Sequence, residues 1–184
     1  MVRAAVAGLG VGVPASFMRS TFVGSNPTPA TPHGDRPMDF RIVIDTREIE
    51  PYGFDCATVR RKLDAGAYSV DGLETAVAVE RKSLSDFTST VIHHFERFAA
   101  ELERLSGLDA ACIVVEADLD TVLRGRSSGD LRGVRPASLL GAAVHIGLRW
   151  GVPVFWCGSR PAARAFTDTF LRTFVRTHRE RPGP

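Results

Sequence analysis

Short apolar runs alternate along this chain with segments of helical periodicity, and this alternation constrains the fold more than any other feature. Residues 40–45 (FRIVID) and 110–117 (AACIVVEA) are apolar runs typical of strands, the second of a kind that is buried on both faces. Residues 136–150 (PASLLGAAVHIGLRW) indicate a helix, and residues 152–156 (VPVFW) indicate a further short strand. Interleaved strands and helices predict an α/β fold.

The segment after the first strand is expected to supply a helix and a hairpin. The segment 55–66 (DCATVRRKLDAG) is predicted to form a helix that has Asp55 as its N-cap and Gly66 just past its end. Residues 67–72 (AYSVDG) and 75–82 (TAVAVERK) are predicted to form two strands, joined by a turn at the Asp-Gly pair 71–72.

Two longer amphipathic helices are expected further along the chain. Residues 90–107 place apolar side chains at three- and four-residue spacing and end in glycine, which predicts one helix. Residues 161–178 form the last predicted helix, whose apolar stripe consists of Phe166, Phe170 and Phe174. Packing into the core is the default interpretation of that stripe, and a homodimer seam is the functional alternative.

One domain is expected to account for most of the chain. The 184 residues, 44% hydrophobic and 24% charged, suit a single core, which we place at residues 39–180 with a tail at 181–184. Residues 1–38 lack a periodic apolar face and include a stretch rich in Pro, Thr and Gly. We interpret this segment as a disordered or mis-assigned N-terminal extension, with a signal peptide as the alternative.

Charge and cysteine content exclude several classes of protein. The formal net charge of +2 neither favours nor opposes a polyanionic partner. Cys56, Cys112 and Cys157 are widely spaced and predict neither a disulfide framework nor a zinc site, so a reducing, cytoplasmic setting fits. No apolar run approaches the roughly 18 residues of a membrane span, so no membrane partner is expected.

The strand predicted at 75–82 ends in a pair of opposite charges. Because side chains alternate along a strand, Glu80 and Lys82 lie on the same face. A carboxylate can bind a metal ion, and the compact ammonium group of lysine can hold or polarise an attacking water. Lysine is rare in this chain, since Lys62 is the only other one. An ordinary ion pair at a strand end remains the simpler explanation of Glu-x-Lys taken alone.

Acidic residues also stand at other strand ends. Asp45 closes the first strand, Glu48 follows it, and Glu80 lies near the end of the hairpin. Neighbouring strand ends can bring carboxylates within reach of one ion, and such oxygen ligands favour Mg²⁺ or Mn²⁺. These ions suit phosphodiester hydrolysis, because they activate water and stabilise the developing charge.

The order of three motifs resembles a known family. VIDTRE (43–48), LDAGAYSV (63–70) and VERKSLSD (79–86) are similar to the ordered signature of the XPF-type structure-specific endonuclease domain, of the restriction-endonuclease-like PD-(D/E)XK superfamily. Its E-R-K-x-x-x-D element is matched in full by Glu80, Arg81, Lys82 and Asp86. The likeness covers about residues 40–176 and suggests a stand-alone bacterial or phage-like form.

This resemblance implies a fold, an activity and a set of functional residues. The implied fold is a central mixed sheet flanked by helices. The implied activity is Mg²⁺-dependent incision of branched or flapped DNA in repair or recombination, with Mn²⁺ as a substitute, by a homodimer that forms through the C-terminal helices. Catalysis is assigned to Asp45, Glu80 and Lys82, with Asp45 and Glu80 as metal ligands. Supporting or DNA-side roles are assigned to Arg47, Glu48, Arg81 and Asp86.

One position departs from the pattern of this family. The family's Gly-Asp falls on Gly66-Ala67, so a metal-binding carboxylate is replaced by a methyl group. Of the nearby aspartates, Asp64 and Asp71, only Asp71 shares the strand face of position 67 and could compensate. A catalytically silent subunit that binds DNA or a partner nuclease is therefore the alternative function. A DNA-independent assembly module is a third interpretation.

An arginine-rich loop is the predicted DNA contact outside the motifs. Arg124, Arg126, Arg132 and Arg135 are spaced by glycines. Such a loop could follow a phosphate backbone, and a solvated loop without a ligand is the competing interpretation.

Overall fold

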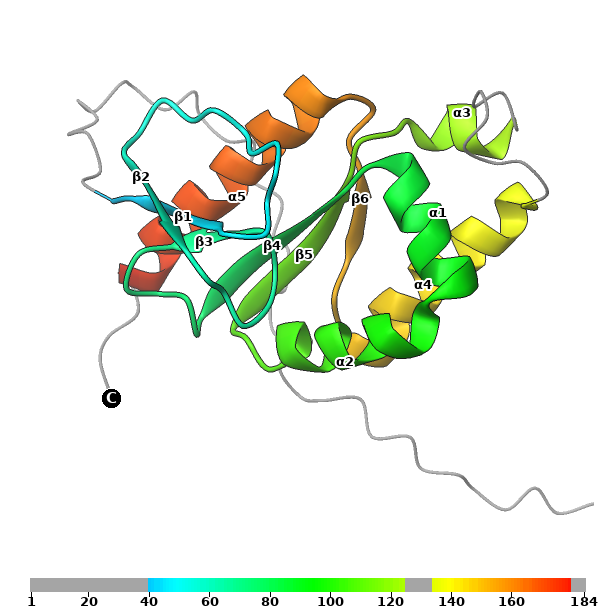
Figure 1. The fold of residues 1–184 in the computed structure, drawn as a ribbon, viewed down its shortest axis with the longest axis horizontal. Coiled ribbons are helices and arrows are strands. Elements are labelled where there is room, and N and C mark those ends of the chain that lie inside the picture. Colours follow the sequence, from blue (N-terminus) through cyan, green and yellow to red (C-terminus); the bar gives the residue numbers. More distant parts are fainter. Residues whose placement is uncertain (1–39, 125–133, 180–184) are drawn as a thin grey trace, which may run out of the picture. The chain divides into compact units, whose positions relative to one another are not determined.

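A six-stranded mixed sheet forms the centre of the structure, a computed structural model that describes residues 40–124 and 134–179 (Figure 1). Its strand order is β2-β1-β3-β4-β5-β6. The strands are β1 (Ile42–Asp45), β2 (Thr58–Arg61), β3 (Tyr68–Val70), β4 (Val77–Lys82), β5 (Ala110–Val115) and β6 (Val154–Trp156). The helices are α1 (Leu84–His93), α2 (Phe95–Ser106), α3 (Leu119–Leu123), α4 (Pro136–Trp150) and α5 (Arg160–Arg179).

The direction of each strand decides which residues meet at one edge of the sheet. β1 pairs in parallel with β2, β3 runs antiparallel to both of its neighbours β1 and β4, and β4, β5 and β6 are parallel. The C-terminal ends of β1, β4 and β5 therefore lie at the same edge as the N-terminal end of β3. The predicted α/β class, a restriction-endonuclease-like mixed sheet flanked by helices, is confirmed.

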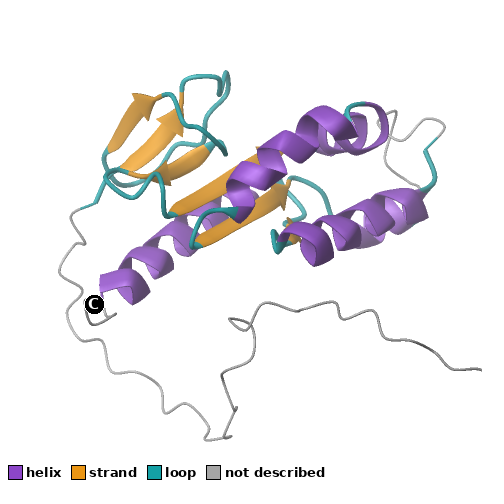
Figure 2. Ribbon diagram, turned by 90° about the horizontal axis from the view of Figure 1, so that it is seen from below, coloured by secondary structure: helices purple, strands orange, loops and turns teal. Residues whose placement is uncertain are grey.

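Helices flank the sheet in two groups (Figure 2). α1, α2, α3 and α4 share a core with one face, where Leu102 of α2 packs in a cluster with Ala78 of β4 and Ile113 of β5. α5 packs against β3, β4 and β5, and its buried residues are Ala163, Thr167, Leu171 and Val175. Because side chains alternate along β4, Glu80 points to the same side as Ala78, towards α2.

The segment predicted as a helix at 55–66 contains the edge strand β2 instead. Its β-branched Thr58 and Val59 pair in register with β1. Asp55 caps no helix here and forms an ion pair with Arg164 of α5 at 2.7 Å. The prediction was wrong because three of the four β2 residues are exposed, which leaves a helix no apolar face to bury, while pairing with β1 supplies backbone hydrogen bonds.

The connection from β4 to β5 contains two helices, where one was predicted at 90–107. α1 ends at His93, and His94 adopts the non-helical angles φ −130° and ψ 27° before α2 begins. A single helix over 84–106 would be about 34 Å long, whereas a strand of six residues spans about 20 Å. The break allows both helices to bury apolar residues in one core, namely Leu84, Phe87, Val91, Phe98, Leu102 and Leu105.

The other predicted elements are present. β1, the β3–β4 hairpin, β5, α4, β6 and α5 lie where the apolar patterns placed them. Gly72 (φ 80°) forms the hairpin turn and Gly151 (φ 67°) ends α4, both with left-handed backbone angles that favour glycine. The short helix α3 was not predicted, and Asp118 caps it by accepting backbone N–H groups of α3.

The phenylalanine stripe of α5 does not pack into the core, so the default interpretation was wrong. Phe166, Phe170 and Phe174 are only partly buried and lie beside the buried stripe of the helix. They line a shallow, mainly apolar groove together with Ala110, Thr169, Thr173 and Thr177. This groove is the surface on which the predicted homodimer seam now depends.

Some predictions fall on parts of the chain that the structure does not describe. The extension at 1–38, the tail at 181–184 and the loop residues Arg126 and Arg132 lie outside the described residues. In the described ranges, no helix combines the length and the apolar character needed to cross a membrane.

Candidate active site

Asp45 and Glu80 come from strands that flank position 67. The backbone N–H of Asp45 donates to the carbonyl oxygen of Ala67 at 2.9 Å, and the N–H of Ala67 donates to that of Val79 at 2.9 Å. Asp45, Ala67 and Glu80 line one cleft of about 170 Å³. Arg47, Glu48, Gly66 and Glu101 complete its lining. The sheet order thus brings together the two carboxylates that were predicted to be catalytic.

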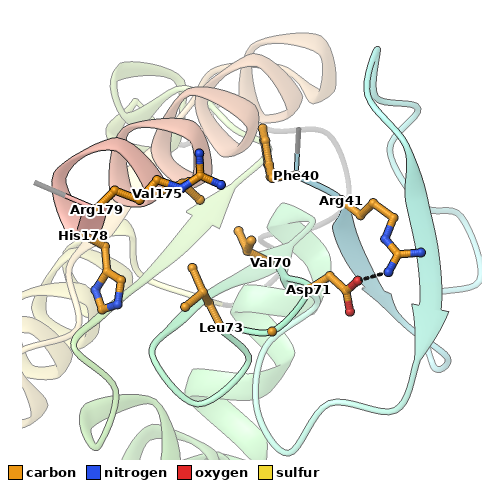
Figure 3. A pocket seen from close by; sticks show the side chains of 9 residues that line it. Phe40, Arg41, Val70, Asp71, Leu73, Val175, His178 and Arg179 are labelled. Atoms are coloured by element: carbon orange, nitrogen blue, oxygen red, sulfur yellow. Dashed lines mark hydrogen bonds and ion pairs between the residues drawn. The ribbon is translucent and has the colours of Figure 1, made fainter. Parts of the chain in front are cut away.

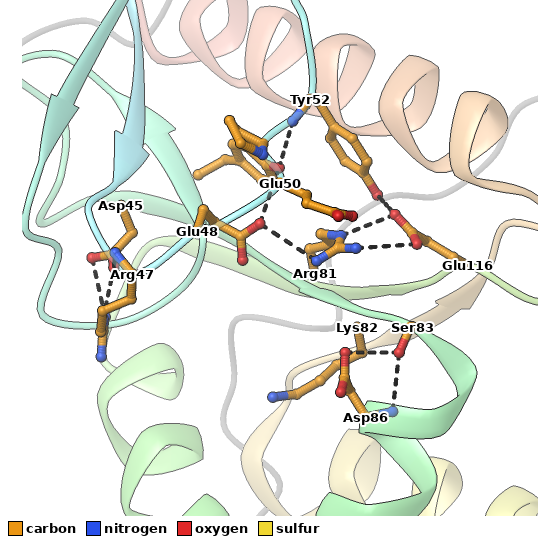
Figure 4. A network of polar contacts seen from close by, with 12 residues as sticks. Asp45, Arg47, Glu48, Glu50, Tyr52, Arg81, Lys82, Ser83, Asp86 and Glu116 are labelled. Atoms are coloured by element: carbon orange, nitrogen blue, oxygen red, sulfur yellow. Dashed lines mark hydrogen bonds and ion pairs between the residues drawn. The ribbon is translucent and has the colours of Figure 1, made fainter. Parts of the chain in front are cut away.

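Asp45 is 1% exposed, and hydrogen bonds hold its carboxylate in place. Oδ1 accepts from the backbone N–H and the Nε of Arg47 at 2.7 and 2.6 Å (Figure 4). Oδ2 accepts from the Leu63 N–H at 2.6 Å. Burial opposes ionisation, but these hydrogen bonds outweigh it and hold the pKa of Asp45 below its usual value. Asp45 is therefore a fixed, ionised carboxylate with a guanidinium beside it.

Glu80 and Lys82 form a largely buried ion pair. Nζ of Lys82 lies 2.9 Å from Oε1 of Glu80 and 5.0 Å from the centre of the Phe98 ring on α2. Burial raises the pKa of Glu80 to about 7, although the charge of Lys82 acts in the opposite direction. For Lys82, burial favours the neutral amine, but the charge of Glu80 outweighs it and raises the pKa. Lys82 is thus a compact cation fixed at the end of β4.

Arg81 points to the other face of β4 and belongs to a buried polar network (Figure 4). Its Nε and Nη2 donate to the two oxygens of Glu116 at 2.9 and 3.3 Å, and Nη1 lies 3.5 Å from Oε2 of Glu48. The Tyr52 hydroxyl and the Arg160 guanidinium also donate to Oε1 of Glu116, at 2.8 and 3.0 Å. The network joins the segment after β1, the ends of β4 and β5, and the start of α5.

Glu116 was not identified from the sequence, although a signal was present. It directly follows the apolar run of β5, which is the kind of position that drew attention to Asp45 after β1. Burial opposes its ionisation, but hydrogen bonds from Arg81 and Tyr52 outweigh burial and lower the pKa of Glu116. Glu116 is therefore the anion around which this network is organised.

Asp86 lies in the first turn of α1 and is not among the residues that line the cleft. Oγ of Ser83 accepts the backbone N–H of Asp86 at 3.0 Å and donates to its Oδ2 at 2.7 Å (Figure 4). These bonds cap the helix that begins directly after Lys82. The position of Asp86 thus suits a supporting role for the lysine.

Glu101 is a second residue that was not identified from the sequence, and it lines the cleft from α2. It lies three residues after the buried Phe98, within the apolar stripe of that helix. A charged residue inside an apolar stripe is the sequence signal that could have identified it. Burial is the main cause of the raised pKa of Glu80, and the nearby charge of Glu101 adds to it.

A basic groove adjoins the cleft. Arg47, from the turn after β1, and Lys82, at the end of β4, line it together with His94, Arg97 and Arg104 from the α2 region. The two hollows share Arg47 and Glu101 as lining residues, so the groove leads directly to the carboxylates.

The described arginines of the predicted DNA loop lie apart from these hollows. Arg124 pairs with Asp120 at 2.7 Å, and Arg135 is the residue before α4. Neither lines the cleft or the basic groove. Among the described residues, the cations that line the basic groove are therefore Arg47, Lys82 and the arginines of α2.

Asp71, the predicted replacement for the missing aspartate, lies in a different pocket (Figure 3). It pairs with Arg41 and Arg61 and lines a hollow of about 670 Å³ together with residues from the end of α5. The prediction was wrong because a shared strand face does not imply a shared edge. Four residues of extended chain separate positions 67 and 71 by about 13 Å.

The donor set of the cleft fits a hard divalent cation, although its present arrangement does not yet form a site. Carboxylate oxygens are the ligands that Mg²⁺ and Mn²⁺ prefer, and Asp45, Glu80 and Glu101 line the same cleft. Among the described residues, no three His, Cys, Asp or Glu side chains are grouped closely enough to hold an ion. The guanidinium of Arg47 donates hydrogen bonds to both oxygens of Asp45 and to the carbonyl oxygen of Leu63, and 58% of its side chain is exposed. A metal ion bound to Asp45 would have to displace this guanidinium.

The sheet order and the residues at its edge define a restriction-endonuclease-like α/β domain. The chain belongs to the ERCC4 domain family, whose sequence model matches residues 44–170. That range contains Asp45, Ala67, Glu80 and Lys82. The resemblance to the XPF-type nuclease domain, predicted from three motifs, is confirmed.

Similar solved structures include two of an archaeal protein. One is XPF from Aeropyrum pernix, at 21% identity and a TM-score of 0.58, over 74% of this chain and 65% of that one. The other is XPF from Aeropyrum pernix in complex with DNA, at 22% identity and a TM-score of 0.57, over 75% of this chain and 66% of that one. The chain thus spans just under two thirds of the length of the proteins it matches, and at this identity the likeness concerns the fold. No curated protein matches the sequence.

Proposed function

We propose that this chain is a divalent-metal-dependent endodeoxyribonuclease that cuts branched or flapped DNA in repair or recombination. Membership of the ERCC4 domain family and the likeness to an XPF structure with DNA support a nuclease that binds DNA. The observation that carries the proposal is the meeting of Asp45, Glu80 and Lys82 at one edge of the sheet. A cytoplasmic setting agrees with the free thiols of Cys56, Cys112 and Cys157.

The residues of the cleft have separate roles in this proposal. Asp45 and Glu80 would hold Mg²⁺, for which Mn²⁺ would substitute. When bound, the ion lowers the pKa of a water molecule and polarises the phosphodiester. Lys82 orients the attacking water and offsets the negative charge that develops on the phosphate. When DNA binds, the guanidinium of Arg47 releases Asp45 and donates two hydrogen bonds to a DNA phosphate instead. Glu48, Arg81 and Asp86 support the strand end and the helix that follows it.

A cleavage assay with the full chain tests this proposal. Flap, fork and duplex DNA of one sequence are incubated with Mg²⁺, Mn²⁺ or a chelator. We expect incision of the flap and fork with either ion, weaker incision of the duplex, and no incision with the chelator. Equal incision of all three substrates would contradict the preference for branched DNA, and no incision of any would contradict the enzymatic function.

A catalytically silent subunit is the second candidate, and Ala67 is the observation that favours it. The methyl group of Ala67 lies between Asp45 and Glu80, where a carboxylate would complete a metal site. In that case, the chain binds branched DNA or a partner nuclease with the same fold and does not cut. Binding of forked DNA without incision under either metal ion is the result that identifies this candidate.

Arg97 offers a test of the DNA path. It is exposed on α2 and lines the basic groove beside Lys82. We expect Arg97→Ala to weaken binding of forked DNA roughly tenfold, and to reduce the slope of log affinity against log salt by about 1, as loss of one phosphate contact requires. Fluorescence anisotropy at several salt concentrations measures both. Arg176→Ala, a change at an exposed position of α5, is the control.

Homodimerisation through the C-terminal helices is proposed on the basis of the groove along α5. Partly buried Phe166, Phe170 and Phe174 form an apolar surface there, and Val144 and Leu148 of α4 are 52% and 83% exposed. We expect a dimer by light scattering at micromolar concentration, and a monomer for Phe170→Asp, because a charge inside an apolar seam loses hydration. Ala165→Asp, exposed on the same helix, is the matched control. A monomeric parent chain would remove the basis for this seam.

A further inference from the structure

Position 67, where the family has an aspartate and this chain has an alanine, is hydrogen-bonded to a strand on each side. Ala67 is bonded to Asp45 of β1 and to Val79 of β4, so a side chain at this position projects between the two candidate metal ligands. Ala67 is 4% exposed and provides only a methyl group. Two carboxylates alone are a weak donor set for a dication, because affinity rises with the number of charged oxygen ligands.

Glu101 is the carboxylate that reaches this gap from outside the sheet. α2 buries Phe98, Leu102 and Leu105 against the core, and position 101 lies on the same side of the helix. The helix therefore directs Glu101 towards the sheet, where it lines the cleft with Ala67 and Glu80. A carboxylate on a half-buried helix face is unusual unless it has a partner.

Within residues 40–124 and 134–179, Glu101 has neither a hydrogen-bond donor nor an ion-pair partner. Its neighbour on α2, Glu103, differs, because it accepts a hydrogen bond from Nε1 of Trp150 at 2.8 Å. Glu96, in the first turn of the helix, is exposed. Of these three glutamates on α2, only Glu101 lines the cleft.

We propose that Glu101 supplies the carboxylate that is missing at Ala67, so that Asp45, Glu80 and Glu101 together hold the metal ion. This inference rests on the proposed metal-dependent nuclease and deepens it by naming a third ligand. The cleft of about 170 Å³ has room for an ion with several of its waters, at roughly 30 Å³ each. The three carboxylates that would hold the ion come from β1, β4 and α2, and the cleft that they line adjoins the groove that Lys82 lines.

Metal binding by the full chain, without DNA, tests the ligand directly. Calorimetric titration with Mn²⁺ is compared for the parent chain, Glu101→Gln and Glu96→Gln. The two variants remove the same charge from the same helix, so the general electrostatic effect is matched. We expect Glu101→Gln to weaken Mn²⁺ binding at least about tenfold and Glu96→Gln to change it less than about twofold. Thermal unfolding in chelator shows whether each variant is folded.

A variant that adds a carboxylate to the cleft provides the second part of the experiment. Ala67→Asp places a carboxylate between Asp45 and Glu80, and we expect it to strengthen Mn²⁺ binding in the parent chain. In the Glu101→Gln background, Ala67→Asp is expected to restore affinity to about the parent level, because one ligand replaces the other. If the buried aspartate prevents folding, the comparison of Glu101→Gln with Glu96→Gln decides the question alone.

The outcomes separate this proposal from the function on which it rests. A parent chain that binds Mn²⁺ and cuts DNA, with Glu101→Gln unchanged in both, overturns the role of Glu101 and leaves the nuclease intact. A parent chain that binds no Mn²⁺ at millimolar concentration and cuts nothing overturns both. Weakened binding in Glu101→Gln, together with a higher Mn²⁺ requirement for cleavage, supports both.

Discussion

Replacing Lys82 with alanine is expected to slow DNA cleavage about 100- to 1,000-fold, while affinity for forked DNA stays within about threefold. The ammonium group lies 2.9 Å from Glu80 at the end of β4, and only 15% of the side chain is exposed. Its charge is therefore little screened by solvent and acts on the transition state more than on bound DNA. Single-turnover kinetics and fluorescence anisotropy separate the two effects.

The chain offers a matched control for this experiment. Lys62 is the only other lysine in the sequence and is exposed, so Lys62→Ala removes an equal charge without touching the cleft. Lys82→Arg is expected to recover little activity, because a guanidinium is a planar fork and cannot replace a compact ammonium group that orients one water. Cleavage by Lys82→Ala at the rate of Lys62→Ala would contradict the assigned role.

Replacing Arg81 with methionine is expected to lower the free energy of unfolding by about 3 kcal/mol. Arg81 is 15% exposed and is the principal partner of Glu116, which would keep its charge in a buried site after the change. After the change, Glu116 keeps only Tyr52 and the partly exposed Arg160 as donors, and Glu48 loses the guanidinium 3.5 Å away. Two largely buried carboxylates thus lose a compensating charge, which costs more than the ion pair contributes. Urea denaturation measures the difference.

An exposed arginine provides the comparison for Arg81. Arg41 pairs with Asp71 on the surface, where its side chain is 57% exposed, so Arg41→Met is expected to cost no more than about 1 kcal/mol. The double variant Arg81→Met, Glu116→Gln is expected to be less destabilised than the sum of the two single variants, because the buried charge is gone. Equal stabilities for Arg81→Met and Arg41→Met would show that the network contributes little.

Several elements could be predicted from local pattern because their cause is local. Alternation identified the β3–β4 hairpin and the shared face of Glu80 and Lys82, and uninterrupted apolar runs identified β1 and β5. The edge strand β2 could not be predicted in this way, since its exposed residues carry no apolar pattern and only pairing with β1 makes it a strand. The break at His94 likewise depends on the length of the sheet that the helices must cover.

The residues of the candidate site also fall into two groups, those that the sequence identified and those that depend on tertiary packing. Asp45, Glu80 and Lys82 were found because strand ends and motif order are visible in the sequence. Glu101 was missed because its relevance depends on α2 packing over the sheet. The choice of Asp71 was wrong because two residues on the same face of a strand can still lie at opposite edges of the sheet. Both errors concern positions in space that spacing along the chain does not determine.

The sequence by itself determined the α/β class, the family-like order of motifs, the Glu-x-Lys pair and the loss of a carboxylate at Ala67. These features depend on residue identity and on the two-residue repeat of a strand, which hold wherever the strand lies. Only the tertiary structure decided that Ala67 lies between Asp45 and Glu80, that Arg47 is hydrogen-bonded to Asp45, and that Glu101 lines the cleft. The reason is physical, because strand order and helix layering arise from burying apolar faces across the whole domain, and neighbours in the cleft are up to 56 residues apart in the chain.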